Sequence, residues 1–295
     1  MTRTLVRLIN GIITFAVTLA LAGAGLYAGY ALWDNRQIYS AAETTQLEML
    51  RFKPKVVSET GEVEEAPSFE ELLAINPDVC AWVTMDNTAI DHPVLQGATN
   101  LTYINTDVYG DFALAGSIFL DTRCDRSFLG NYNLLYGHHM DNHGMFGDLD
   151  LYKDETFFKE NQTGTLIVPD GVYSLRVLAC IVTEASDDAI FEPDTWQETT
   201  TVQNEDGTVT VKVNIDPEAV SSAAEVERMR LLASYCSEKA LYLNADNMTE
   251  LENRLSAGEA PRILALSTCS SEYTNARTIL LTLIESRRLA ATAIT

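Results

Sequence analysis

The sequence predicts a mostly β domain, a barrel that carries one or two helices, joined to one N-terminal transmembrane helix. Two observations predict this fold class. An apolar stretch without charge covers residues 11–33, and many short runs of β-forming residues, separated by turn residues, follow it. The length of 295 residues and the hydrophobic content of 46% are enough for a buried core.

The composition excludes several classes of protein. With 42 acidic and 20 basic residues, the net charge is −22, and no basic stripe is available to neutralise nucleic-acid phosphates. The hydrophobic content also excludes a disordered acidic tail. Five cysteines are too few for a disulfide scaffold, and their odd number leaves at least one thiol unpaired within the chain.

The apolar stretch has the length of a membrane anchor. Its 23 residues form a helix of roughly 34 Å, enough to cross a bilayer core of about 30 Å. Arg3 and Arg7 precede it, so we expect the N-terminus inside and the rest of the chain outside, in a single-pass cell-membrane protein. A cleaved signal peptide is the alternative, because the Ala-rich residues 20–22 could be cut. The apolar region of such peptides is shorter, about 7–15 residues, which favours an uncleaved anchor.

Three segments follow from this pattern. Residues 1–33 form a cytoplasmic stub and anchor, residues 34–67 a juxtamembrane helix and linker, and residues 68–295 the folded extracellular domain. The helix covers residues 34–50. The domain begins with capping-box spacing at residues 68–71, which predicts a short helix there.

Ten short strands are expected in the domain. They lie at residues 81–85, 90–96, 117–120, 133–136, 165–168, 172–182, 199–203, 208–213, 262–268 and 278–284. The hairpin within residues 196–215 is an extra element that could shape a binding groove or decorate the surface, and we expect decoration. A helix then starts with Pro217 at its first position and continues with helical periodicity through Val226, Met229 and Leu232.

Three of the four histidines lie close together, which allows two interpretations. The four are His92, His138, His139 and His143. A metal site is one interpretation, because neutral imidazole is a good zinc ligand and His139 and His143 are four residues apart. The other is a general base in a loop at a strand end. Glycines at 137 and 144 bracket the cluster, and neither zincin nor Cys-x-x-Cys spacing occurs, so we favour the loop and expect no metal.

Among the cysteines, Cys269 has the surroundings of a nucleophile. It ends the strand at residues 262–268 and is followed by a polar loop, whereas Cys180 and Cys236 read as small buried hydrophobes. Cys80 and Cys124 could pair, which the sequence does not decide. The alternative is that the thiol of Cys269 has no role in function.

Arg277 strengthens the case for Cys269. If the last two strands pair antiparallel, the loop between them brings the thiol and the guanidinium to the same end of the sheet. A fixed cation there favours the thiolate and stabilises the oxyanion formed when the thiolate attacks a carbonyl. The alternative is a surface arginine paired with Glu272 or Glu285.

These residues occur in motifs that closely resemble the sortases, and class B sortases in particular. The motifs are Tyr-Gly-His at 136–138, Leu-Ser-Thr-Cys at 266–269 and Ala-Arg at 276–277. Residues 75–78, 90–94, 115–121 and 145–149 also resemble class B segments. The resemblance covers roughly residues 68–285. It implies an eight-stranded sortase barrel with N-terminal helices and a long helix before the last strands.

The resemblance also implies an activity, and nothing in the sequence calls for a metal or organic cofactor. Cys269 would cleave a C-terminal sorting signal after Thr, usually of the Asn-Pro-x-Thr type, and form a thioester. An amine of a peptidoglycan precursor or a pilin would then accept the acyl group. His138 would be the general acid and base, and Arg277 would hold the substrate and the oxyanion.

Two points stay open at this stage. His139 stands where class B relatives often carry Asn, and the residues alone do not choose between the adjacent histidines, although the motif alignment assigns His138. A cysteine protease that releases its product to water, or a non-catalytic anchored binding protein, is the alternative function.

Overall fold

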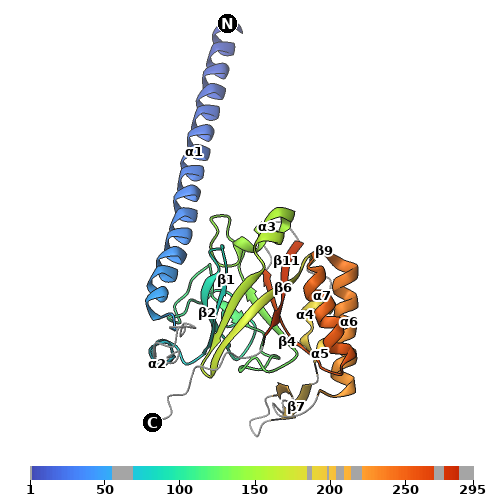
Figure 1. Ribbon diagram of the computed structural model, residues 1–295. Coiled ribbons are helices and arrows are strands. Elements are labelled where there is room, and N and C mark those ends of the chain that lie inside the picture. Colours follow the sequence, from blue (N-terminus) through green and yellow to red (C-terminus); the bar gives the residue numbers. More distant parts are fainter. Residues whose placement is uncertain are drawn as a thin grey trace. The chain divides into compact units, whose positions relative to one another are not determined.

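The computed structural model describes residues 2–54, 69–184, 188–197, 199–203, 209–213, 221–268 and 276–285 (Figure 1). The chain forms two compact units, Met1–Ala41 and Ala42–Thr295. The predictions for Cys269, for the linker at 55–67 and for Pro217 lie outside the described residues.

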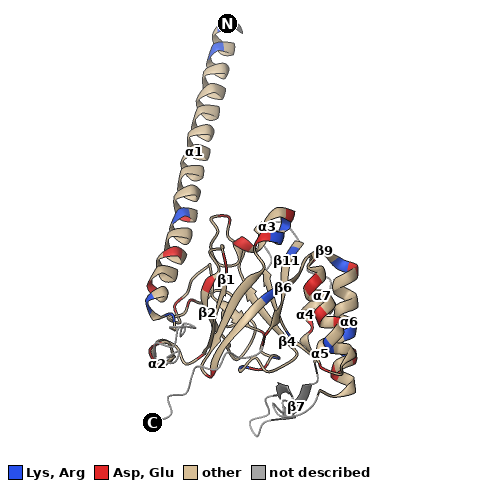
Figure 2. Ribbon diagram, viewed as in Figure 1, with Lys and Arg blue, Asp and Glu red and all other residues tan. Residues whose placement is uncertain are grey.

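One long helix, α1 (Thr2–Met49), makes up the first unit and continues into the second. It is long and apolar enough to cross a membrane, with a mean hydropathy of 2.0 over its most apolar window. Figure 2 shows that its charged residues lie towards its two ends, Arg3 and Arg7 at one and Asp34 onwards at the other. The helix expected at 34–50 is the continuous end of α1, because no Gly or Pro interrupts residues 30–49.

A closed eight-stranded barrel forms the centre of the second unit. Its strands are β1 (Val79–Met85), β2 (Asp91–Leu95), β3 (Ile118–Leu120), β4 (Tyr132–Gly137), β5 (Thr163–Val168), β6 (Gly171–Glu184), β10 (Arg262–Thr268) and β11 (Ala276–Ile284). They pair in the order β11-β10-β4-β3-β2-β1-β5-β6, and β6 pairs again with β11 to close the barrel. The β2–β3 and β4–β10 pairs are parallel. The predicted eight-stranded barrel is confirmed.

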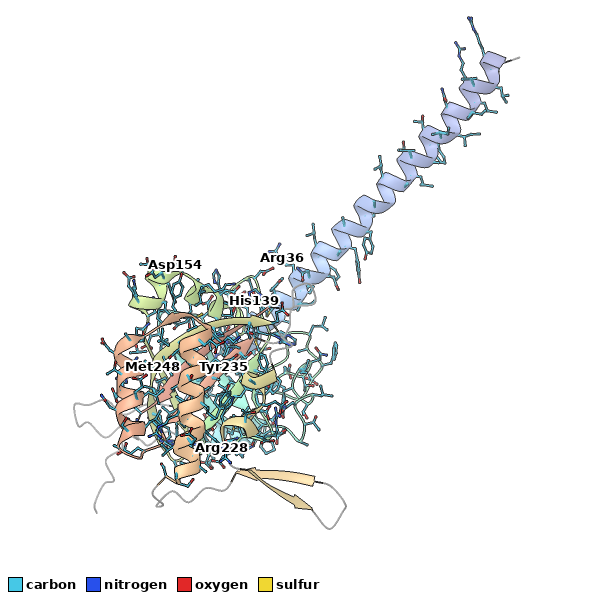
Figure 3. All side chains as sticks on the ribbon, turned by 90° about the vertical axis from the view of Figure 1, so that its right-hand side faces the viewer. Arg36, His139, Asp154, Arg228, Tyr235 and Met248 are labelled. Atoms are coloured by element: carbon cyan, nitrogen blue, oxygen red, sulfur yellow. The ribbon has the colours of Figure 1, made fainter. Side chains whose placement is uncertain are left out.

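Helices and short elements surround the barrel. They are η1 (Leu50–Phe52), α2 (Glu70–Ile75), η2 (Gly147–Lys153), α3 (Glu155–Glu160), α4 (Asp188–Phe191), α5 (Pro193–Trp196), the hairpin β7 (Thr199–Gln203) and β8 (Val209–Val213), α6 (Ala223–Lys239), β9 (Ala240–Leu243) and α7 (Ala245–Ser256). The long helix α6 and its neighbour α7 lie side by side over β6, as Figure 3 shows through their residues Tyr235 and Met248.

The residues expected to begin two helices, Ser68 and Pro217, lie outside the described residues. The short helix α2 begins at Glu70 after Phe69, which makes no side-chain cap. A complete capping box occurs instead at α6, where Ser222 and Glu225 satisfy each other's backbone N–H groups. This cap begins α6 at Ala223.

The end of α1 packs into the core of the second unit. Met49 is 1% exposed and belongs to a core cluster with Leu72 and the fully buried Trp82. Lys53 follows and forms a 2.8 Å ion pair with Asp91 of β2. The last turns of the helix are therefore part of the folded domain.

We expect Met49→Ala to lower the free energy of unfolding of a soluble 34–295 piece by about 2–5 kcal/mol, because the truncation leaves a cavity in the core. Leu47→Ala is the matched control: this side chain on the same helix is 58% exposed, so the change should stay within about 0.5 kcal/mol. Urea unfolding measures both. Equal effects of the two substitutions would show that the helix end does not belong to the cooperative unit.

Candidate active site

The C-terminal ends of β4 and β10 and the start of β11 lie at one edge of the barrel. In the parallel pair of β4 and β10, Gly137 lies opposite Thr268, so His138 and Cys269 are the next residues of adjacent strands that run in the same direction. The antiparallel partner of β10 is β11, where Arg277 lies near the start. The expected antiparallel pairing of the last two strands is confirmed. Cys269 itself lies outside the described residues.

The position before His138 needs a glycine. A Cβ atom on Gly137 would lie 2.4 Å from the Cδ1 of Ile118 and 2.8 Å from the Phe146 ring. Real Cβ contacts are not this short, so a larger residue would displace the side chains of Ile118 and Phe146. The Tyr-Gly-His pattern therefore reflects the packing of this strand end.

His138 is half-buried and is held through one ring nitrogen. Its Nε2 lies 2.7 Å from the carbonyl oxygen of Ile104. A carbonyl oxygen only accepts, so Nε2 carries a hydrogen, and Nδ1 is the basic nitrogen of the neutral imidazole. The Ile104 segment is fixed in turn, because the Ser117 N–H donates to the Tyr103 carbonyl (3.0 Å) and the Tyr103 hydroxyl donates to Asp78 (2.8 Å).

The other two clustered histidines contact carboxylates. His139 Nε2 lies 3.1 Å from Asp150, and His143 Nδ1 lies 2.5 Å from Asp148. The segment is a loop, as expected, closed by a bridge between His139 and Met145. Among the described residues, no group of three His, Cys, Asp or Glu side chains is placed to hold a metal ion.

Arg277 reaches from β11 to the end of β10. Its Nη1 donates to the carbonyl oxygen of Thr268 (2.9 Å), the residue before Cys269, and its guanidinium lies 5.8 Å from the centre of the Phe191 ring. Glu285, one partner considered for a surface arginine, pairs with Arg176 instead, and Glu272 lies outside the described residues.

The four described cysteines are buried free thiols: Cys80, Cys124, Cys180 and Cys236. Burial raises the pKa of Cys80, Cys180 and Cys236 to about 12 and also raises the pKa of Cys124. They are therefore poor nucleophiles at neutral pH. The pairing of Cys80 with Cys124 that the sequence left open does not occur, because both thiols are free.

Comparisons with known proteins agree with this arrangement. The chain is 33% identical over 155 residues to sortase B of Staphylococcus aureus, 52% of this chain and 64% of that protein, and 28% identical over 189 residues to sortase B of Listeria monocytogenes, 63% of this chain and 75% of that protein. A class B sortase of Streptococcus pyogenes involved in pilus biogenesis is 31% identical, with a TM-score of 0.53 over 74% of this chain and 98% of that one. The chain belongs to the class B sortases. No family model matches it.

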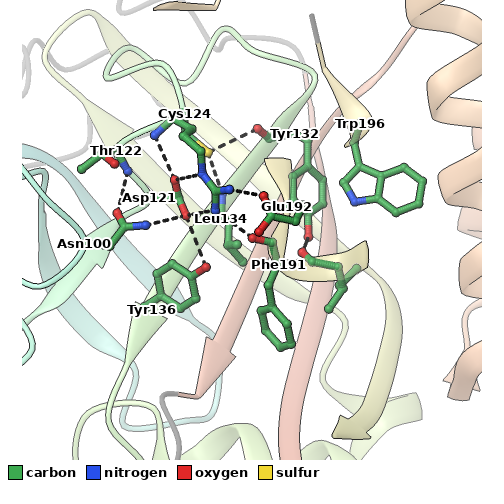
Figure 4. Close-up of polar contacts among 12 residues, drawn as sticks. Asn100, Asp121, Thr122, Cys124, Tyr132, Leu134, Tyr136, Phe191, Glu192 and Trp196 are labelled. Carbon is green, nitrogen blue, oxygen red and sulfur yellow. Dashed lines mark hydrogen bonds and ion pairs between the residues drawn. The ribbon is translucent and has the colours of Figure 1, made fainter. Parts of the chain in front are cut away.

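In this class B sortase, the buried carboxylate of Asp121 accepts hydrogen bonds from several side chains (Figure 4). One of them belongs to β4, the strand that ends just before His138. Asp121 is fully buried after β3 and accepts hydrogen bonds from the Nε (2.9 Å) and Nη2 (2.8 Å) of Arg123. It also accepts from Asn100 (2.9 Å) and from the hydroxyl of Tyr136 (3.3 Å), which lies two residues before His138. The hydrogen bonds to Asp121 raise the pKa of Arg123, and burial raises the pKa of Tyr136.

The same arginine holds the segment that carries the ring beside Arg277. Arg123 Nη2 donates to the carbonyl of Phe191 (2.8 Å), and its Nη1 pairs with Glu192. Asp121 and Tyr136 lie in motifs noted in the sequence, but those motifs did not predict the network, because its members are spread over more than ninety positions.

We expect Asp121→Ala to cost about 3–5 kcal/mol of stability, because it leaves the Arg123 charge largely buried and without its main partner. Glu238→Ala, at a carboxylate that is 75% exposed, is the control and should change stability by less than about 0.5 kcal/mol. Urea unfolding of both variants measures the difference. A cost for Asp121→Ala as small as that of the control would contradict the assigned role of the network.

Because His92 is buried, we expect the stability of this sortase to fall at acidic pH. Burial lowers the pKa of His92 to about 4, and its Nε2 is buried without a hydrogen-bond partner among the described residues. The unfolded chain binds the proton near pH 6.5, so stability falls as the pH drops from about 6.5 to 4.

We expect His92→Gln to remove about 2–3 kcal/mol of the stability difference between pH 7 and pH 4.5. The measurement is the free energy of unfolding of both proteins at the two pH values. Parallel pH dependences would show that His92 is not buried as a neutral group.

Proposed function

We propose that the chain is a membrane-anchored cysteine transpeptidase in which Cys269 is the nucleophile, His138 the general acid and base, and Arg277 the oxyanion and substrate stabiliser. The observation that carries the proposal is the register of β4, β10 and β11, since it directs the three positions to one edge of the barrel. The four described thiols are buried with raised pKa values, which further supports Cys269.

In the acylation step, the Cys269 thiolate attacks the carbonyl carbon of the peptide bond after Thr in a C-terminal sorting signal. The oxyanion that forms accepts hydrogen bonds from Arg277. Nδ1–H of the His138 imidazolium protonates the leaving amine as the C–N bond breaks, which yields a thioester and a neutral imidazole. His138 keeps its Nε2–H on the Ile104 carbonyl throughout this step.

In the transfer step, an amine attacks the thioester and gives its proton to Nδ1 of His138. The C–S bond breaks, the thiolate returns, and the imidazolium is restored for the next cycle. A thioester conserves the energy of the acyl bond, so transfer competes with hydrolysis where water is kept away.

The sorting signal we propose is of the Asn-Pro-x-Thr type, and the acceptor is an amine of a peptidoglycan precursor or a pilin. Two relatives support this class of substrate: the structure of S. aureus sortase B has been determined in complex with a substrate, and the S. pyogenes relative is involved in pilus biogenesis. The apolar length of α1 supports a single-pass anchor over residues 1–33 with its N-terminus inside, followed by segments 34–67 and 68–295.

We expect Cys269→Ala to abolish turnover of a sorting-signal peptide and His138→Ala to reduce kcat by about 10²–10⁴-fold, since the proton transfers are lost. His139→Ala should cost far less, because the His139 ring contacts carboxylates beside the site. Steady-state kinetics measure all three. A loss with His139→Ala equal to that with His138→Ala would move the general base to His139.

Two further outcomes separate the alternatives. In a transpeptidase, added triglycine should attack the thioester, so that the peptide is released as its triglycine amide and turnover is faster. In a protease, water would still release the peptide as the free acid, at the same rate as without triglycine. An anchored binding protein would keep its function in Cys269→Ala. Its Cys269 would also react with a thiosulfonate no faster than an ordinary thiol.

A further inference from the structure

Asp150, in η2, connects two segments of the candidate site through one carboxylate. Its Oδ2 lies 3.1 Å from the Nε2 of His139, and its Oδ1 accepts the hydroxyl hydrogen of Thr278 (2.8 Å). His139 follows His138 at the end of β4, and Thr278 follows Arg277 in β11. The two residues next to the general base and the arginine therefore share one acceptor.

A second hydrogen bond extends this connection to the strand of the nucleophile. The backbone N–H of Thr278 donates to the Oγ1 of Thr268 (3.2 Å), and Thr268 directly precedes Cys269. Thr278 and Thr268 are 5% and 3% exposed, so these bonds are shielded from water. Asp150 thus reaches the flanks of all three candidate residues within two hydrogen bonds.

The carboxylate is ionised at neutral pH, as this role requires. Burial raises the pKa of Asp150, but the hydrogen bonds from Lys153 and Thr278, together with the charges of Lys153 and His139, outweigh that effect and lower the pKa overall. Lys153 Nζ lies 2.7 Å from Oδ2 and balances the charge from within η2. The acceptor is therefore strong and fixed on an element packed against β10 and β11.

We propose that Asp150 is a positioning residue of the transfer reaction: its carboxylate fixes the segments that carry His138, Cys269 and Arg277 relative to one another. The proposal rests on the proposed function of these three residues. The nucleophile, the general acid and the oxyanion donor must all contact the same carbonyl group of the substrate. A displacement of about 1 Å can lower the rate as much as 10²-fold. A carboxylate that joins the flanking residues restricts such displacements.

The test compares four variants of the full-length protein in detergent. Asp150→Asn removes the charge, Thr278→Val removes the hydroxyl donor at nearly constant volume, and Thr278→Ser keeps the donor. Glu155→Gln is the matched control, because it removes one negative charge from a side chain that is 59% exposed and five positions away. Circular dichroism first establishes that each variant is folded at the assay temperature.

We expect Asp150→Asn and Thr278→Val to lower kcat about tenfold with KM within about twofold of the wild type, because positioning acts on the reacting groups rather than on binding. Thr278→Ser and Glu155→Gln should stay within about twofold in both parameters. A purely structural role would lower the melting temperature and leave kcat of the folded protein unchanged. That outcome, or a kcat within twofold of wild type in both Asp150→Asn and Thr278→Val, overturns the proposal.

A second readout does not depend on turnover. The rate constant for modification of Cys269 by a thiosulfonate, corrected with Cys269→Ala for the other thiols, reports on the surroundings of the sulfur. We expect this rate to fall several-fold in Asp150→Asn and Thr278→Val and to be kept in Thr278→Ser. If the wild type transfers no acyl group, the proposed function fails, and equal labelling rates in all variants would then overturn the role of Asp150 separately.

Discussion

The parallel pairing of β4 with β10 is the constraint on which the candidate site depends. Thr268 and Gly137 lie opposite each other although 131 positions separate them in the sequence. Parallel neighbours need a long crossover connection, and here it includes β5, β6, the helices outside the barrel and the β7–β8 hairpin. The entropic cost of closing so long a loop grows only with the logarithm of its length. The pairing of β6 with the whole of β11 then closes the barrel.

Two carboxylates stabilise the same strand end from the residues on either side of His138. Asp121 accepts from Tyr136, two positions before it, and Asp150 contacts His139, one position after it. Each carboxylate is also bound to a cation, Arg123 or Lys153, so neither leaves an uncompensated charge beside the barrel. Because the Ile104 carbonyl holds the imidazole itself, both the backbone and the ring of His138 are restrained.

Local sequence patterns predicted the strands well and the small helices poorly. The strands at 199–203 and 262–268 have the predicted bounds, and the antiparallel pairing that brings Arg277 towards the end of β10 followed from a short loop. The elements η2, α3, α4 and α5 were missed because each is only four to seven residues long. Helices this short are marginal alone and depend on tertiary contacts, which no local pattern contains. Asp150 was missed for a related reason, since nothing distinguishes it in sequence among 42 acidic residues, and Asp121 was noted only as part of the motif at 115–121.

The adjacent His138 and His139 can be told apart by their contacts in the structure. Composition and spacing did not distinguish His138 from His139, but their contacts differ in kind. His138 is bound to a carbonyl, an acceptor that stays neutral and keeps Nε2 protonated during the proton transfers that we propose for Nδ1. His139 has carboxylates near both ring nitrogens, 3.1 Å away at Asp150 and 3.7 Å away at Asp141. A proton shuttle needs one nitrogen that can release its proton to substrate without losing the contact that orients the ring. His138 meets this condition with a single hydrogen bond, whereas the hydrogen bond of His139 serves to join β4 to η2.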